Sequence, residues 1–414
     1  MSFLINKTTV VEKNLDSVIN DFINKIKSEK DEFNAILGYI ESKNETLNNF
    51  IKEEKSDLMK INQLAVLRKW NSYTPILPEK EDIINKGGGY FISYNNTGIV
   101  IDPGYNFIEN FLNAGYRLDD IDIIFISHAH DDHTAQLEAI FSLLYKRNKR
   151  SEHPKQIELY LNLGSFKKFA GFFDLTTINP KSYINKIFIL NEHHHFDINP
   201  DISVFISKVK HHEMITANYS VGLTFSLGNQ NEEPVILKFT CDTGWDTKIE
   251  NENEELMSVY KINNIDILVC HIGSIKKDEL DYDINKSFAD NESTGNILYG
   301  YHLGLIGVVA EIHKWNPNIA LISEFGQELN AVRIKIADKI QSELKCPTLP
   351  VDINFKINLD DFKIQSYKTK KYHDVNNIIP GKKDDGSIVF YNKNELSASE
   401  LLDEQKAVNI MPIY

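Results

Sequence analysis

The apolar and polar residues of this chain follow two different patterns. In the first part, apolar residues recur at intervals of three and four, which is the spacing of one helix face. They do so over residues 15–26, 33–40 and 58–67. Two or three helices are therefore predicted before the first proline, Pro75. Helices of this kind could pack on the main domain, dock a protein partner or form a homo-oligomer.

Beyond Pro78, short apolar stretches alternate with turns and with helical runs. Strands 90–94 and 99–101 are expected around a tight turn, and helical spacing follows at 107–112. It returns after Thr134 and after His302. Further strands are predicted at 121–126, 157–161, 187–190, 204–209, 220–227, 235–240, 265–270 and 319–323. This alternation predicts an α/β fold in which helices cover layered sheets.

The pattern weakens from about Cys346, and its last strong feature is a hairpin-like turn at 384–387. We therefore divide the chain into three parts. These are an N-terminal helical region over 1–75, a main domain over 76–345 and a small C-terminal extension over 346–414.

The densest cluster of metal-binding side chains directly follows the apolar run 121–126. Three histidines and two aspartates stand in six residues, His-Ala-His-Asp-Asp-His at 128–133. Neutral imidazole and carboxylate are ligands that zinc prefers. So many titratable groups packed together have no stabilising purpose without a cation. The motif therefore predicts a metal site, with His128, His130, Asp132 and His133 as candidate ligands.

Four later places put a polar residue at the end of a predicted strand. Loops of a layered sheet converge on one edge, so these residues are expected near the first motif. They are His211 or His212, Asp242, His271 and Glu324.

Taken together, these motifs resemble the metallo-β-lactamase fold superfamily over about residues 87–329. His-Ala-His-Asp-Asp-His is the central motif of that superfamily. Ile101–Gly104 matches its early strand-loop signature, and Thr240–Gly244 matches its bridging-aspartate motif. The resemblance implies a four-layer αββα sandwich and a hydrolase with two divalent metal ions, zinc or alternatively manganese.

The resemblance also implies a role for each candidate ligand. The implied ligands are His128, His130 and His211 or His212 for the first metal, Asp132 and His133 for the second, and Asp242 for both. Of the two neighbouring histidines, we prefer His212, because a ligand histidine followed by an acidic residue is familiar in this superfamily.

The last ligand departs from the pattern of the tRNA 3′-processing relatives, in which a histidine follows the final strand. Here Glu324 follows it. Carboxylate also binds zinc, so Glu324 is the first choice for the second metal and His302 is the rival. His302 and His271 correspond to the groups that assist proton transfer in these relatives. With Asp132, they are the predicted catalytic residues, and His302 is the candidate general acid.

These features predict hydrolysis. Two cations about 3.5–4 Å apart lower the pKa of a bridging water, so that hydroxide exists at neutral pH. The first hypothesis is a phosphodiesterase acting on RNA, DNA or a cyclic nucleotide. The second is a hydrolase of an uncharged ester, thioester, lactone or lactam. The third is a metal-bearing effector subunit that a partner activates.

Composition narrows the setting. The net charge of −14 argues against a broad nucleic-acid surface and favours a small or short substrate. No apolar run approaches the ~20 residues of a membrane span, and the N-terminus shows no secretory signal. Three widely spaced cysteines fit no disulfide framework. We therefore expect a cytoplasmic protein without a membrane partner.

Overall fold

The computed structural model describes residues 14–52, 55–69, 87–174, 182–213, 218–228, 233–293, 298, 300–383 and 386–402. The chain forms two compact units, Met1–Glu54 and Lys55–Tyr414. Pro75, Pro78 and two residues of the predicted turn at 384–387 lie outside the described residues. Among the described residues, no helix combines the length and the apolar composition needed to cross a membrane.

The first unit contains two helices, α1 (Leu15–Ser28) and α2 (Lys30–Lys52). The side chain of Asn14 begins α1 by accepting a hydrogen bond from the backbone N–H of Asp16 (3.1 Å). The predicted helices at 15–26 and 33–40 are confirmed. None of the side chains described over 14–49 is buried. Within this unit, the apolar faces of both helices are therefore uncovered.

The second unit is built on two β-sheets. The nine-stranded sheet has the order β16 (Tyr372–His373), β15 (Ile364–Gln365), β14 (Phe355–Asn358), β1 (Gln63–Val66), β2 (Tyr90–Tyr94), β3 (Thr97–Ile101), β4 (Ile123–Ile126), β5 (Ile157–Asn162) and β6 (Ile184–Leu190). The seven-stranded sheet has the order β13 (Thr348–Pro350), β12 (Ile319–Phe325), β11 (Ile267–Ile272), β10 (Val235–Phe239), β9 (Val221–Leu227), β8 (Ile202–Lys208) and β7 (His195–Asn199). Strands β17 (Ile378–Lys382) and β18 (Ile388–Asn392) form a separate hairpin.

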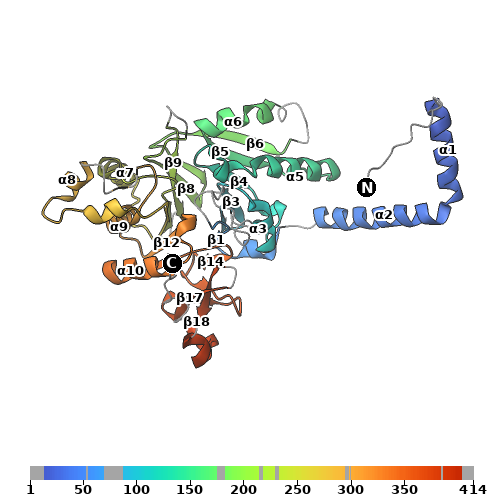
Figure 1. Cartoon of the computed structure of the whole chain (residues 1–414). Helices are drawn as coiled ribbons and strands as arrows, with labels where there is room; N and C mark the ends of the chain where they lie inside the picture. Colours follow the sequence, from blue (N-terminus) through green and yellow to red (C-terminus); the bar gives the residue numbers. More distant parts are fainter. Residues whose placement is uncertain are drawn as a thin grey trace, which may run out of the picture. The chain divides into compact units, whose positions relative to one another are not determined.

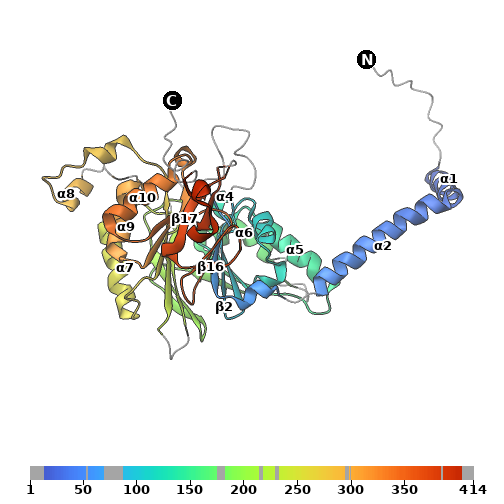
Figure 2. The ribbon, with the colours of Figure 1, turned by 90° about the horizontal axis from the view of Figure 1, so that it is seen from below.

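Helices cover the outer face of each sheet (Figures 1 and 2). The helices on the side of the nine-stranded sheet are α3 (Phe107–Asn113), α5 (Leu137–Arg150) and α6 (Leu163–Asp174), and the short α4 (Asp131–Thr134) follows β4. Those on the side of the seven-stranded sheet are α7 (Thr247–Val259), α8 (Phe288–Ser293), α9 (Leu305–Trp315) and α10 (Arg333–Leu344). The order of layers is αββα, as the sequence predicts.

Strand β4 shows how the sequence produces these layers. Successive side chains of a strand point to opposite faces of the sheet. Ile123 and Phe125 therefore join the apolar core between the two sheets. Ile124 and Ile126 instead join the core between the nine-stranded sheet and its helices. A strand that is buried on both faces reads as the continuous apolar run seen in the sequence.

Two segments differ from the sequence-based division. The run 58–67, predicted as a third helix, forms a short 3-10 helix, η1 (Asp57–Lys60), followed by β1. Strand β1 pairs with β2 and with β14, so a segment predicted to lie in the C-terminal extension joins the same sheet. Short apolar runs fit a buried strand as well as a helix, and only the pairing partners distinguish the two.

Candidate metal centre

The predicted site residues come together at one edge of the sandwich. Strands β3 and β4 are parallel, as are β10, β11 and β12. The carboxyl ends of parallel strands lie at the same edge of a sheet, so their following loops meet. Asp102 follows β3, the motif 128–133 follows β4, Asp242 follows β10, and Glu324 stands near the end of β12.

The backbone is strained where these strands end. Asp102, Cys241 and Glu324 have φ of 50°, 51° and 49°, in the left-handed region that side chains other than glycine rarely adopt. Each such residue costs about 1–3 kcal/mol and is retained where the surrounding structure requires it. Position 104 requires glycine for a steric reason. A Cβ there would lie 1.8 Å from the carbonyl oxygen of Asp132.

Three histidines and one aspartate form the first cluster. His128 Nε2 lies 3.1 Å from His130 Nδ1, which lies 3.3 Å from His211 Nε2. Asp242 Oδ2 lies 3.6 Å from His128 Nε2 and 3.8 Å from His211 Nε2. These four atoms all lie within 4.8 Å of one another, which suits the donor set of one metal ion.

Hydrogen bonds on the far side of two of these rings fix where their protons lie. His130 Nε2 lies 3.1 Å from the carbonyl oxygen of Glu213, and His211 Nδ1 lies 2.9 Å from that of Tyr301. A carbonyl oxygen only accepts, so both of these nitrogens carry the proton. The nitrogens that face each other across the cluster are therefore unprotonated.

The same reasoning applies to His128. Ser127 Oγ donates its only proton to Asp102 Oδ2 (2.6 Å), so it accepts a hydrogen bond from His128 Nδ1 (3.0 Å). His128 Nε2 is therefore unprotonated. Its lone pair faces the same space as those of His130 Nδ1 and His211 Nε2. Three lone pairs this close repel one another unless a cation lies between them, so the residues fit a bound metal ion.

Burial and neighbouring charge prepare these groups for a cation. Burial and the nearby imidazoles lower the pKa of His128, His130 and His211, so these rings are neutral ligands near pH 7. Burial acts to raise the pKa of Asp242, but the imidazoles of His133 and His302 hold it well below its usual range. Asp242 Oδ1 is buried and receives no hydrogen bond from the described residues.

The structure places His211, and not the preferred His212, in the cluster. His211 is buried and faces the cluster, whereas His212 is exposed and its ring stacks on Tyr301 at 4.4 Å. Burial alternates along this segment, so Glu213 is buried again on the inner side. Glu213 then accepts hydrogen bonds from the backbone N–H of Ala129 and from Asn162, each at 2.6 Å. The acidic neighbour supports the motif loop and does not mark its adjacent histidine as the ligand.

The sequence is also recognised as that of a known family. A family described as "Beta-lactamase superfamily domain" matches residues 97–321, more than half of the 414 residues. The chain belongs to this beta-lactamase superfamily. No curated protein matches the sequence.

Several solved structures are similar to the chain at low sequence identity. The metallo-beta-lactamase fold protein YhfI from Bacillus subtilis is 11% identical, with a TM-score of 0.48 over 71% of this chain and 98% of that one. The short form of human tRNase Z is 12% identical, with a TM-score of 0.47 over 72% and 99%. Zn(2+)-bound PqqB from Methylobacterium extorquens is 12% identical, with a TM-score of 0.48 over 72% and 100%.

The predicted ligands of a second metal form another cluster beside the first. His133 Nε2 lies 3.4 Å from Asp132 Oδ2 and 3.6 Å from Asp242 Oδ2. Asp102 Oδ2 lies 3.0 Å from His133 Nδ1 and orients the ring, so Asp102 supports the site from behind. The guanidinium of Arg68 also enters this cluster, with Nη2 2.9 Å from Asp132 Oδ2.

Arg68 is the site residue that the sequence analysis missed. It stands two positions after β1, and its side chain is 1% exposed. The available signal was a basic residue, followed by Lys69, directly after the apolar run 64–67; charges beside such a run are rarely buried without a partner. The pattern gave no reason to connect it with a motif about 60 residues away.

Glu324 faces Arg68 and Tyr90. Its Oε2 lies 3.2 Å from Arg68 Nε, and its Oε1 accepts a hydrogen bond of 2.5 Å from the Tyr90 hydroxyl. Burial raises the pKa of Glu324 above its usual value, although the charge of Arg68 opposes that effect. The choice between Glu324 and His302 as a metal ligand stays a prediction.

His302 lies between the clusters and solvent. Its Nδ1 is 3.7 Å from Asp242 Oδ2, and its side chain is 27% exposed. The residues on either side of it are held in place. His211 bonds to the carbonyl oxygen of Tyr301, and His271 Nε2 accepts the backbone N–H of Leu303 (3.2 Å). His271 therefore acts on the loop that carries His302; its direct catalytic role stays a prediction.

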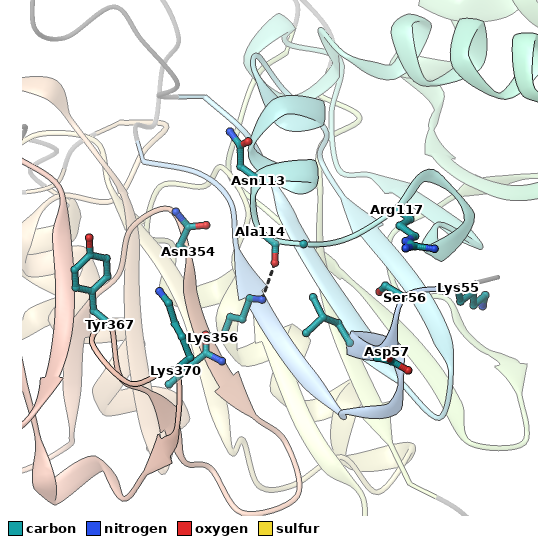
Figure 3. A pocket seen from close by; sticks show the side chains of 13 residues that line it. Lys55, Ser56, Asp57, Asn113, Ala114, Arg117, Asn354, Lys356, Tyr367 and Lys370 are labelled. Atoms are coloured by element: carbon teal, nitrogen blue, oxygen red, sulfur yellow. Dashed lines mark hydrogen bonds between the residues drawn. The ribbon is translucent and has the colours of Figure 1, made fainter. Parts of the chain in front are cut away.

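A separate cleft of about 710 Å³ is lined by residues of η1, β14, β15 and the loop after α3 (Figure 3). Its basic residues are Lys55, Arg117, Lys356 and Lys370. Lys356 Nζ donates to the carbonyl oxygen of Ala114 (3.0 Å), and burial together with Lys370 lowers its pKa to about 8. No predicted site residue is among those described as lining this cleft, so it is distinct from the metal centre.

Proposed function

We propose that this protein is a zinc-dependent hydrolase that cleaves phosphodiester bonds. The observation that carries the proposal is the convergence of three unprotonated imidazole nitrogens and Asp242 on one point. Three nitrogen ligands and a carboxylate are a donor set typical of zinc. A cation held there would lower the pKa of a coordinated water and offset negative charge on a substrate oxygen.

The protein's own residues supply the remaining parts of a hydrolytic site. Asp242 stays ionised in a buried position and is available to orient water. His302 is within reach of Asp242 and of solvent, so it is placed to give a proton to a departing alkoxide. The bonds that hold the backbone of Tyr301 and Leu303 keep its ring in position.

Two lysines beside the motif favour an anionic substrate. Lys168 Nζ donates to the carbonyl oxygen of Ala129 (2.8 Å) and pairs with Asp131 (2.6 Å). Lys210 precedes His211, its Nζ lies 3.9 Å from Asp246 Oδ2, and its side chain remains about one-third exposed. These local positive charges lie at a site edge within a chain of net charge −14. A phosphodiester gains from such a field, whereas an uncharged ester or lactone does not.

Cleavage of bis-p-nitrophenyl phosphate tests the proposal. Activity is expected to disappear on chelation, return with zinc and be lost in Asp242→Ala. In Lys210→Ala we expect a lower kcat/KM for the phosphodiester and an unchanged value for p-nitrophenyl acetate. Turnover of lactones or thioesters by a protein that leaves all phosphodiesters intact would instead favour the hydrolase of uncharged substrates.

We also propose that the N-terminal helices pair with a second copy of the chain. Leu15, Phe22 and Ile36 are 71%, 59% and 49% exposed, which is unfavourable in water without a partner. Both helices carry acidic and basic residues, which could pair between two copies. Phe22→Asp in the full chain is expected to halve the mass in light scattering; an unchanged mass would refute self-association.

Cys241, Cys270 and Cys346 are free thiols. Their state supports our proposal of a reducing compartment, the cytoplasm.

A further inference from the structure

The second cluster has an occupant supplied by the protein. We propose that the guanidinium of Arg68 takes the place of the second metal ion, so that the centre binds one divalent cation. This inference rests on the proposed metal site at His128, His130 and His211. It replaces the two metal ions that the superfamily resemblance implies.

The contacts of Arg68 coincide with the predicted ligand set. Nη2 lies 2.9 Å from Asp132 Oδ2 and 3.1 Å from His133 Nε2. Nε lies 3.2 Å from Glu324 Oε2, and Nη1 donates to the carbonyl oxygen of Asp132 (2.9 Å). Asp132, His133 and Glu324 are the side chains predicted to bind the second metal alone. The guanidinium contacts all three of them.

The hydrogen-bonding capacity of these atoms agrees with this occupancy. Asp102 Oδ2 lies 3.0 Å from His133 Nδ1, so in the neutral ring the lone pair of His133 is on Nε2. A guanidinium has donors only, and one of them faces this lone pair at 3.1 Å. The first cluster differs in this respect, since its three nitrogen lone pairs face one another. The first cluster therefore still requires a cation, and the second already has one.

The charges around Arg68 also disfavour a second metal ion. Asp132 and Glu324 place two carboxylates against one guanidinium, and Asp242 is shared with the first cluster. A divalent ion bound to Asp132 and His133 would lie next to a buried positive charge with little water to screen it. Arginine remains protonated in proteins, so it cannot relieve this repulsion by losing a proton.

The backbone fixes Arg68 in this position. Leu67 is held on both sides, by its N–H to the carbonyl oxygen of Gly89 (2.9 Å) and by Asn110 Nδ2 to its carbonyl oxygen (2.9 Å). Gly88 has φ of 123°, and a Cβ there would lie 1.6 Å from Leu67 O. The glycine run 87–89, which is no phosphate loop, therefore lets the chain carrying Arg68 pack closely.

Metal content tests the proposal without reference to activity. Wild type loaded with excess zinc and then dialysed is expected to hold one zinc per chain by elemental analysis. Arg68→Ala removes the cation beside Asp132, His133 and Glu324 and leaves the volume of its side chain empty. This variant is therefore expected to hold two zinc ions per chain. Arg333→Ala is the matched control. Arg333 is also fully buried and pairs with Asp352 at 3.0 Å, so its loss should leave the count at one.

Two zinc ions in wild type, or one in a folded Arg68→Ala protein, would overturn the proposal. If Arg68→Ala does not fold, manganese-loaded wild type decides the question by electron paramagnetic resonance. An isolated six-line signal at saturation supports one ion per centre, and an exchange-coupled pair refutes it. Wild type that binds no metal would remove the proposed zinc-dependent function as well as this inference.

Discussion

The two halves of the centre use the same kinds of side chain and differ in what lies between them. In one half, His128, His130 and His211 direct unprotonated nitrogens at one another. In the other, His133 and Asp132 direct their acceptor atoms at Arg68. Both halves draw on one six-residue motif, so the motif alone does not set the number of metal ions. The outcome depends on which distant segment completes each half: the chain after β8 brings a histidine, and the chain after β1 brings an arginine.

The largest expected effect comes from breaking the histidine half. His128→Ala removes one of three nitrogen ligands, and we expect phosphodiesterase activity to fall by about 1,000-fold or more, equivalent to about 4 kcal/mol. Zinc retained after dialysis should fall with it. His212→Ala is the matched control, because His212 is exposed and stacks on Tyr301, and it should keep activity within about twofold. If His212→Ala were the inactive variant, our ligand assignment would be reversed.

Removal of the Arg68 guanidinium should lower the free energy of unfolding. Removing one partner of a buried ion pair costs about 3–5 kcal/mol, so metal-free Arg68→Ala and Arg333→Ala should both unfold more easily in urea. Added zinc at about 100 times its Kd should restore about 2.7 kcal/mol to Arg68→Ala beyond its effect on wild type. Arg333→Ala should gain only as much as wild type. Equal gains in all three proteins would contradict the assignment of a vacated second site.

The pH dependence of the unfolding free energy of the metal-free protein tests whether the fold keeps His271 neutral. Burial lowers the pKa of His271 from 6.5 to about 3. The unfolded chain therefore binds this proton at a higher pH than the folded one. The contribution is fully present above pH 6.5 and is lost as the pH falls toward 3. Between pH 6.5 and 4 it amounts to roughly 3 kcal/mol.

His271→Gln keeps an acceptor for the N–H of Leu303 and cannot titrate. Urea unfolding of chelated protein should therefore show a shallower loss of stability in acid for this variant than for wild type. Identical pH profiles would show that His271 is not held neutral by the fold.

Glu324→Gln should have the smallest effect and sharpens the comparison most directly. The amide keeps the shape and removes one charge from Arg68, at a cost of about 1–3 kcal/mol in unfolding free energy. Because Glu324 pairs with the guanidinium, elemental analysis should find the zinc content of wild type unchanged. Loss of one of two bound ions would instead make Glu324 a metal ligand.

Much of the fold followed from local pattern. Strands with continuous apolar runs, such as 121–126, were predicted because burial on both faces leaves a clear trace in the sequence. The strand β1 was predicted as part of a helix, since its three apolar residues, 64–66, are too few to show a strand period. Its identity depends on pairing with β2 and with β14, which lies almost 300 residues further along the chain.

The sequence by itself determined the family and the candidate ligands, because the motif 128–133 and the strand-end residues are short and chemically distinctive. Only the tertiary structure placed His211 in the cluster and left His212 exposed, since this depends on which side chains of the segment face inward. Only the tertiary structure brought Arg68 against Asp132, His133 and Glu324. The physical reason is that a ligand motif is a short local sequence. The cation that lies against it comes from a distant segment, and only the folded chain brings that segment close.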